Sequence, residues 1–136
     1  MALRLPHTLL LALVAAVVAA AVWFGAALAQ PGPSKEQQAR TAAASFFEAL
    51  NAKQFERACT MLSRRYYREN HVRDAQICRL ALWIGMVRSD PVSFRIVAVD
   101  VRGREATVTA LADGAPGTVR LVEEQGRYKV LALEGV

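Results

Sequence analysis

The stretch VSFRIVAVDV, residues 92–101, decides the fold class of this chain. It is rich in Val, Ile and Phe, residues that favour strands, and it follows Pro91, where the spacing of apolar residues changes. Three further strand-like runs follow it, at 105–111, 118–123 and 127–133. Short turns containing Gly separate these runs, and short turns between consecutive strands predict an antiparallel meander.

Upstream of this region, apolar residues recur every three or four positions, which predicts helices. The first is expected over residues 34–51, and its opening Ser-Lys-Glu-Gln reads as a capping box. A second is expected over 54–63, and a third over 74–84 with Gly85 as its C-cap. Three helices before four antiparallel strands predict an α+β domain in which a curved sheet packs on a helical layer.

An uncharged apolar run precedes this domain. Arg4 is its only nearby charge, and residues 9–29 form 21 uncharged positions that end in Ala-Leu-Ala. That ending suits signal-peptide cleavage, whereas 21 residues also suffice for a helix to cross a bilayer. Residues 1–29 are therefore predicted to be a cleaved signal peptide or a retained transmembrane anchor, and we favour retention. A linker, 30–33, then leads to an extracytoplasmic domain, 34–136.

The composition limits the classes of partner. The 136 residues hold 17 Lys and Arg against 12 Asp and Glu, a net charge of +5. Acids and bases are interspersed, so no single-sign run predicts a nucleic-acid partner. The length and the high apolar content exclude a disordered chain, a collagen and a large multi-site enzyme.

The two cysteines, Cys59 and Cys78, both lie in the exported part. An even count in an oxidising compartment favours a disulfide, here between the inner faces of the second and third helices. Two separate buried thiols are the alternative. No metal is expected, because two Cys are too few ligands and His71 is the only His in the exported part.

The order of elements resembles the nuclear transport factor 2-like superfamily, whose fold is a cystatin-like cone. The segment AAASFFEALNAKQFERACTMLS, residues 42–63, resembles the opening of many small secreted members. The segment YKVL, residues 128–131, resembles the last strand, where an aromatic follows a Gly turn. The resemblance covers 34–133 and implies a small exported bacterial member of unknown function. The superfamily includes isomerases, cyclases, dehydratases and binding modules, so the fold does not fix the function.

The resemblance implies a pocket between the concave sheet and the helices. An enzyme of this kind needs a carboxylate or a histidine inside that pocket as a general base. Asp100, at the end of the first strand, and His71, three residues before Asp74, are the catalytic candidates. No acid interrupts an apolar strand centre, which counts against an isomerase- or cyclase-like acid/base enzyme. That enzyme remains the alternative to a binding domain.

A basic and aromatic cluster at 64–73, expected to be a polar loop, is a candidate binding surface. Such a cluster suits an anionic group, or its Tyr rings cover the mouth of the cone beneath Arg stems. Further along the chain, Trp83 is a candidate anchor for a partner, and two mid-strand arginines are candidates to attract an anion. The candidate contact residues are Arg64, Tyr66, Tyr67, Arg68, Trp83, Arg95 and Arg120.

The sequence therefore predicts an extracytoplasmic, non-catalytic binding or accessory domain without a cofactor. Its partner is either a small apolar ligand in the cone or an envelope protein, and residues 9–29 contact the membrane if they are retained. The first strand carries apolar residues on both expected faces, which predicts a homodimer or a protein partner on the outer face of the sheet. The two expected faces are Phe94, Ile96 and Ala98 on one side and Val97, Val99 and Val101 on the other.

Overall fold

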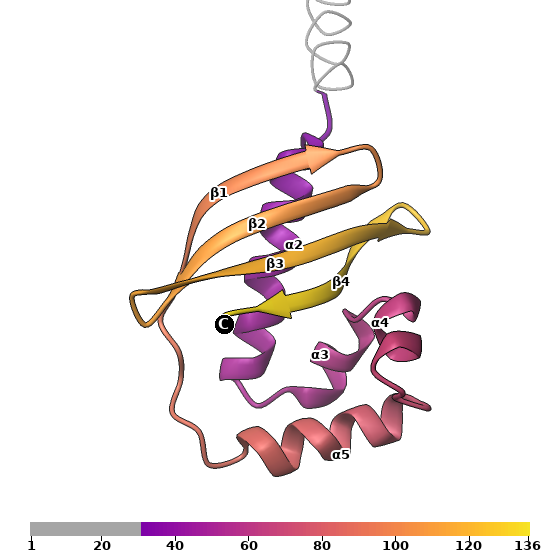
Figure 1. Ribbon diagram of the computed structural model, residues 1–136, viewed down its shortest axis with the longest axis vertical. Coiled ribbons are helices and arrows are strands. Elements are labelled where there is room, and N and C mark those ends of the chain that lie inside the picture. Colours follow the sequence, from indigo (N-terminus) through magenta and orange to yellow (C-terminus); the bar gives the residue numbers. More distant parts are fainter. Residues whose placement is uncertain (1–30) are drawn as a thin grey trace, which may run out of the picture. The chain divides into compact units, whose positions relative to one another are not determined.

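The computed structural model describes residues 31–136, so the predicted signal peptide or anchor, 1–29, lies outside the described residues. Four helices precede a four-stranded antiparallel sheet of order β1-β2-β3-β4 (Figure 1). The predicted α+β class is confirmed, with one helix more than the three expected. Within residues 31–136, no helix combines the length and apolarity needed to cross a bilayer. The elements are α2 (Lys35–Asn51), α3 (Phe55–Thr60), α4 (Arg64–Glu69), α5 (Ala75–Met86), β1 (Phe94–Arg102), β2 (Glu105–Ala112), β3 (Ala115–Glu124) and β4 (Arg127–Glu134).

Helix α2 provides the layer on which the sheet packs. Its N-cap Ser34 accepts a hydrogen bond from the Gln37 amide at 3.1 Å, as the capping box predicted. One side of the helix is buried and contacts all four strands. The Phe47 ring stacks on Phe94 of β1, with ring centroids 3.9 Å apart. The buried residues of α2 are Ala39, Ala43, Phe46, Phe47, Ala49 and Leu50.

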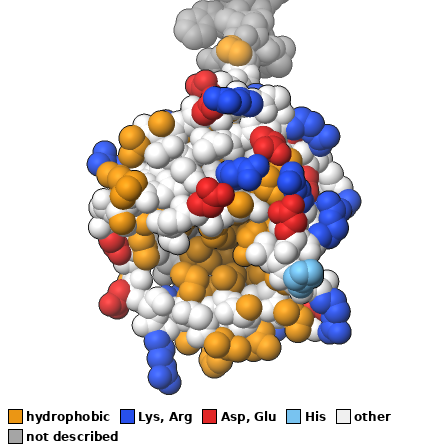
Figure 2. Space-filling view, in the orientation of Figure 1, with side chains coloured by type: hydrophobic (Ala, Val, Ile, Leu, Met, Phe, Trp, Pro, Cys, Tyr) orange, Lys and Arg blue, Asp and Glu red, His pale blue; other side chains and the backbone are white. Residues whose placement is uncertain are grey.

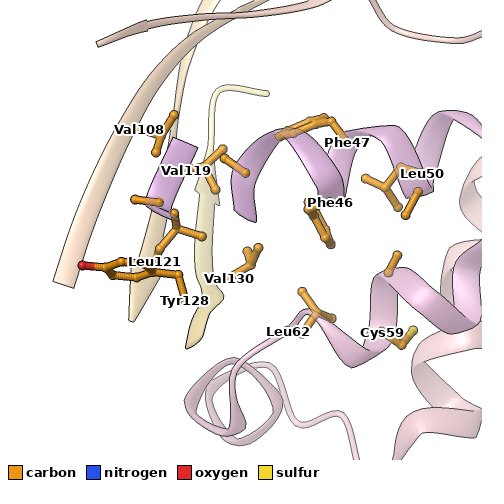
Figure 3. Close-up of a cluster of buried hydrophobic side chains, with 14 of the residues drawn as sticks. Phe46, Phe47, Leu50, Cys59, Leu62, Val108, Val119, Leu121, Tyr128 and Val130 are labelled. Carbon is orange, nitrogen blue, oxygen red and sulfur yellow. The ribbon is translucent and has the colours of Figure 1, made fainter. Parts of the chain in front are cut away.

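The buried side chains of α2 and α3 meet those of the sheet in one core (Figure 3). Phe46 projects from α2 towards Val130 of β4, and Leu121 and Val119 of β3 lie beside it. Each of these side chains is almost completely buried. Burial of apolar area at about 25 cal/mol per Å² is the main force that holds helix and sheet together.

The segment predicted as a polar loop, 64–73, contains a helix, α4. Ser63 is fully buried, and its hydroxyl accepts a hydrogen bond from the Tyr66 amide at 2.9 Å. The Ser63 amide donates to the Val130 carbonyl of β4, so this N-cap is tied to the sheet. An ion pair between Arg65 and Glu69 spans one turn at 2.6 Å. The loop prediction was wrong because the six residues of α4, four charged and two Tyr, show no regular spacing of apolar side chains.

Helix α5 differs from its prediction at its end and on its surface. The N-cap Asp74 is as predicted, but the helix continues through Gly85 to Met86, so Gly85 is not the C-cap. The spacing of apolar residues predicts an inner face of Ile77, Cys78, Ala81, Leu82 and Ile84, but of these only Cys78 is buried. Ile77 and Ile84 are exposed, because α5 packs mainly on α3 and no other element in residues 31–136 covers its far side.

Two bulges change the expected faces of the sheet. In β1 the register shifts between Ile96 and Ala98, which leaves Val97 without a partner in the neighbouring strand. Val99 and Val101 therefore turn inwards and pack against the core on the side of Phe94 and Ile96. Their assignment to the opposite face was wrong, because strict alternation does not survive an inserted residue.

A second bulge lies in β4, at Leu131, opposite Arg120 and Leu121 of β3. Strand β3 also begins earlier than predicted, at Ala115, so the loop before it shrinks to a tight turn. Asp113 and Gly114 in that turn both have positive φ angles. The added strand residues bring Gly117 into the buried face of the sheet.

Candidate functional site

A groove with a volume of about 1170 Å³ lies between α3 and α5. Three exposed apolar side chains of α5, those of Ile77, Leu80 and Trp83, form one wall. The turn before α3 and the outer side of α3 form the other. The complete lining is Lys53, Gln54, Phe55, Glu56, Arg57, Thr60, Gln76, Ile77, Arg79, Leu80 and Trp83.

The solvent side of α5 is apolar for most of its circumference. Trp83 is 54% exposed and Ile84 67% exposed, and Leu80 and Val87 lie between them around the helix. Only Cys78 is fully buried, while Leu82 and Met86 are half-buried against the core. A helix that is apolar on all sides is normally covered on all sides. The exposed apolar side of α5 is therefore a candidate interaction surface.

The attachment of α5 to the body is local and covalent. A disulfide joins Cys59 of α3 to Cys78 of α5, with Cα atoms 6.0 Å apart, which confirms the predicted pairing. At the far end, the Lys53 ammonium donates hydrogen bonds to the carbonyls of Met86 and Ser89. These links fix the apolar side of α5 beside the groove. The disulfide is also consistent with an oxidising, extracytoplasmic compartment.

The groove carries more positive than negative charge. Lys53, Arg57 and Arg79 line it, against the single carboxylate of Glu56. Arg57 donates to the Gln54 side chain at 3.0 Å, which leaves the guanidinium beside the groove. Apolar walls with guanidinium groups at the rim suit a partner that presents apolar side chains and a carboxylate.

In the predicted basic and aromatic cluster, the tyrosines of α4 pack against the core and its arginines are exposed. The Tyr67 hydroxyl donates to the Cys59 carbonyl at 2.9 Å, and both Tyr66 and Tyr67 pack against the core. Burial, followed by the charges of Asp74 and Tyr66, raises the pKa of Tyr67 above its usual 10.0. The two rings therefore pack against the core, as in the alternative interpretation of the cluster, in which the Tyr rings have a structural role. Arg64 and Arg68 lie on α4 and line neither side of the α3–α5 groove.

The two mid-strand arginines lie on the outer side of the sheet. Arg95 is exposed, and Arg120 is half-buried with its guanidinium 3.3 Å from the Glu105 carboxylate. Their neighbours on this side include Thr107 and Thr109 of β2, which are half-buried. With Val99 and Val101 turned inwards, the outer face is more polar than the sequence predicted. Self-association through this face stays a prediction. The apolar strip on which it was based does not lie on this face.

The two candidate general bases lie apart from each other and from the grooves. Asp100 is exposed in β1, and its carboxylate accepts a hydrogen bond from Arg102 at 2.8 Å. His71 is exposed in the turn after α4, where its φ angle is +54°. Neither residue lines the α3–α5 groove or the smaller cavity of about 580 Å³ between α2 and the β3–β4 hairpin.

One buried polar atom in the core has no partner among residues 31–136. The Tyr128 hydroxyl is buried and unpaired, and its ring contributes to the core beneath α2. The Lys35 ammonium lies 6.0 Å from the centre of the ring and pairs with Glu123 at 2.7 Å. Since the hydroxyl is shielded from solvent, it does not form part of an open binding surface.

A second apolar feature faces the viewer in Figure 2, where hydrophobic side chains gather in a hollow between β4 and α5. Of the two elements beside it, β4 carries Leu131, which is buried, and α5 carries Leu82 and Met86, which are half-buried against the core. The hollow lies between the sheet and the helices, where the sequence analysis expected a pocket.

The residues of the α3–α5 groove that sequence reasoning missed are Lys53, Arg57, Arg79 and Leu80. The signal that would have revealed the groove is that apolar residues occupy most of the circumference of α5, more than one neighbouring element can cover. Within residues 31–136, no group of three or more His, Cys, Asp or Glu side chains is arranged to hold a metal. No family model, curated protein or solved structure matches this chain.

Proposed function

We propose that this chain is an extracytoplasmic, non-catalytic binding domain whose partner is an envelope protein. The observation that carries the proposal is the apolar side of α5, exposed beside a basic groove and held in place by a disulfide. The apolar run at 9–29 and the disulfide together favour export, with the run retained as a membrane anchor. Asp100 and His71, both exposed and outside the grooves, make the isomerase- or cyclase-like enzyme the weaker alternative.

The groove favours a particular chemistry in that partner. An apolar segment fits against Leu80 and Trp83, and an acidic residue on the same segment faces Arg57 or Arg79. A centrally placed Trp next to Arg is a common composition for the residues that dominate binding energy. The groove is open rather than enclosed, which suits a segment of another protein better than a buried small molecule.

Photocrosslinking from α5 tests this proposal in cells that produce the full-length chain. A photoreactive phenylalanine analogue replaces Trp83, and a matched chain carries it at Thr109, on the outer face of the sheet. We expect one discrete adduct from position 83 that is lost when Leu80→Asp is added, and none from position 109. Adducts from position 109 alone would show that the partner binds the outer face of the sheet and not α5.

The hollow in Figure 2 supports a second candidate function, the binding of a small apolar ligand. The element order α-α-α-α-β-β-β-β and the two sheet bulges are consistent with the proposed kinship to the cone-shaped superfamily. Native mass spectrometry of the full chain, released from detergent, distinguishes the two candidates. A retained ligand mass that disappears in Met86→Arg, on the half-buried side of α5, but persists in Leu80→Asp would assign binding to the hollow instead of the groove.

A further inference from the structure

A second stripe of α5 runs beside the groove and shares only Ile77 with its lining. Asp74, Ile77, Ala81, Ile84 and Arg88 recur at intervals of three, four, three and four residues. This is the spacing of the contact positions in a pair of packed helices. Ile77, Ala81, Ile84 and Arg88 are exposed, and Asp74 is partly exposed. The stripe continues past Met86, because Val87 keeps a right-handed helical conformation.

The stripe is complementary to itself in the antiparallel direction. If two copies of α5 cross with Ala81 on a two-fold axis, Asp74 of each copy faces Arg88 of the other, and Ile77 faces Gly85. Acid thus meets base at both ends of the pair, and the opposed helix dipoles also attract. Arg88 forms no ion pair with another residue in 31–136, so it is free for this contact. Asp74 caps the helix and pairs with Arg73 at 3.3 Å, and its side chain, 43% exposed, is open to a second cation.

Gly85 is the second observation that points to a packed helix. It lies inside α5, where glycine weakens a helix relative to alanine, and a Cβ built on it would meet no atom within 4 Å. Nothing in residues 31–136 therefore explains the absence of a side chain. The antiparallel pair does, because Ile77 of the facing copy occupies this place and the small Ala81 lets the two backbones approach.

We infer that α5 pairs antiparallel with α5 of a second copy of this chain, about an axis through Ala81. The groove residues Arg79 and Trp83 lie on another side of the helix and stay available to the partner proposed above. A lipid surface fits the stripe less well, since anionic lipids favour basic residues at both ends of a helix and this stripe ends in an acid and a base.

Disulfide trapping in cells producing the full-length chain tests the pairing. Ala81→Cys places a thiol on the proposed axis, and Arg79→Cys places one on the groove side of the same helix. After mild oxidation we expect a disulfide-linked homodimer from Ala81→Cys and none from Arg79→Cys. Ile84→Lys, added to Ala81→Cys, should abolish the crosslink. Arg88→Glu should reduce it, whereas Arg88→Lys should retain it.

Each other outcome overturns the inference. Equal crosslinking from both positions would show random collision, and no crosslink from position 81 would show that the two copies do not meet there. An adduct between the thiol introduced at position 81 and a foreign protein would assign the stripe to that protein. Quenching by brominated lipid of an environment-sensitive fluorophore attached to the thiol at position 81, without a crosslink, would assign the stripe to the membrane. Mass analysis of the Cys59–Cys78 bridge in each variant verifies that the chain has folded.

Discussion

The ammonium of Lys53, in the turn between α2 and α3, donates a hydrogen bond to the carbonyl of Met86, the last residue of α5, at 2.6 Å. The carbonyls at the end of a helix have no partner within the helix, and a cation there also opposes the negative end of the helix dipole. Lys53 thus anchors the end of α5 that lies farther from the disulfide. The position of the exposed apolar side depends on both attachments.

Replacement of Lys53 by Met should loosen the end of α5. The change keeps the length of the side chain but leaves the Met86 and Ser89 carbonyls without their donor. We expect a loss of about 1 kcal/mol in unfolding free energy, because the bond is charged but half-exposed. Lys35→Met is the matched control, since its ion pair with Glu123 is exposed and contributes little. Equal effects of the two variants in urea unfolding would contradict this assignment.

Removal of the disulfide should release α5 before the sheet. The double variant Cys59→Ala and Cys78→Ala is expected to lose about 2–5 kcal/mol of stability. Because α5 packs mainly on α3, hydrogen exchange of amides 75–86 should accelerate much more than that of β2 and β3. A uniform acceleration along the chain would show that α5 belongs to the main cooperative unit.

Gly117→Ala should disrupt the pairing of β3 with the end of the chain. A Cβ at this position would lie 2.8 Å from the backbone of Gly135, and backbone cannot move aside as a flexible side chain does. We expect a loss of about 1–3 kcal/mol, as for other overpacked sites. Thr118→Ala, one residue along the strand and half-buried, should cost less than about 1 kcal/mol. A thermal melt that ranks the two variants the other way would refute the close approach.

The N-cap of α5 should make stability depend on pH in the acidic range. The Ile77 amide donates to the Asp74 carboxylate, which lowers the pKa of Asp74 below its usual 3.8, and Arg73 adds to this effect. A lowered pKa in the folded state contributes stability above the unfolded pKa, and this contribution is lost as the pH falls through the folded value. The stability difference between the wild type and Asp74→Asn should therefore be constant above about pH 5 and shrink below 3.8.

Urea unfolding of both chains at about pH 7, 5 and 3 measures this difference. A gap that stays unchanged down to the lowest pH would show that the charge of Asp74 does not contribute to the cap. A stability difference that grows as the pH falls would be the opposite of the change that the hydrogen bond to Asp74 predicts.

The sequence predicted those elements whose apolar pattern is regular. Helix α2, with Phe46, Phe47 and Leu50 on one face, and the four strands were recognisable from periodicity alone. The pairing of Cys59 with Cys78 followed from their number and their positions on neighbouring helices. In each case the residues themselves carry the signal, because burial of one face imposes a period on the chain.

The remaining features depend on contacts between distant segments. Helix α4 begins at Ser63 because that residue is tied to Val130 in the last strand, a contact between segments far apart in the sequence that no local pattern reveals. The bulge at Val97 reverses the faces of β1 without a Gly or Pro to mark it. The groove was missed because Ile77 and Ile84 were assigned to a buried inner face of α5, whereas a single neighbour, α3, covers only part of the helix.

The central claim is that the apolar side of α5 is covered in the cell and that the outer face of the sheet is not. The most direct test is the rate at which a permeant maleimide labels Leu80→Cys and Thr109→Cys in the full-length chain, in intact cells and after purification. We expect labelling of position 80 to be several-fold slower in cells than after purification, with no change at position 109. Equal rates in cells and after purification at position 80 would contradict it.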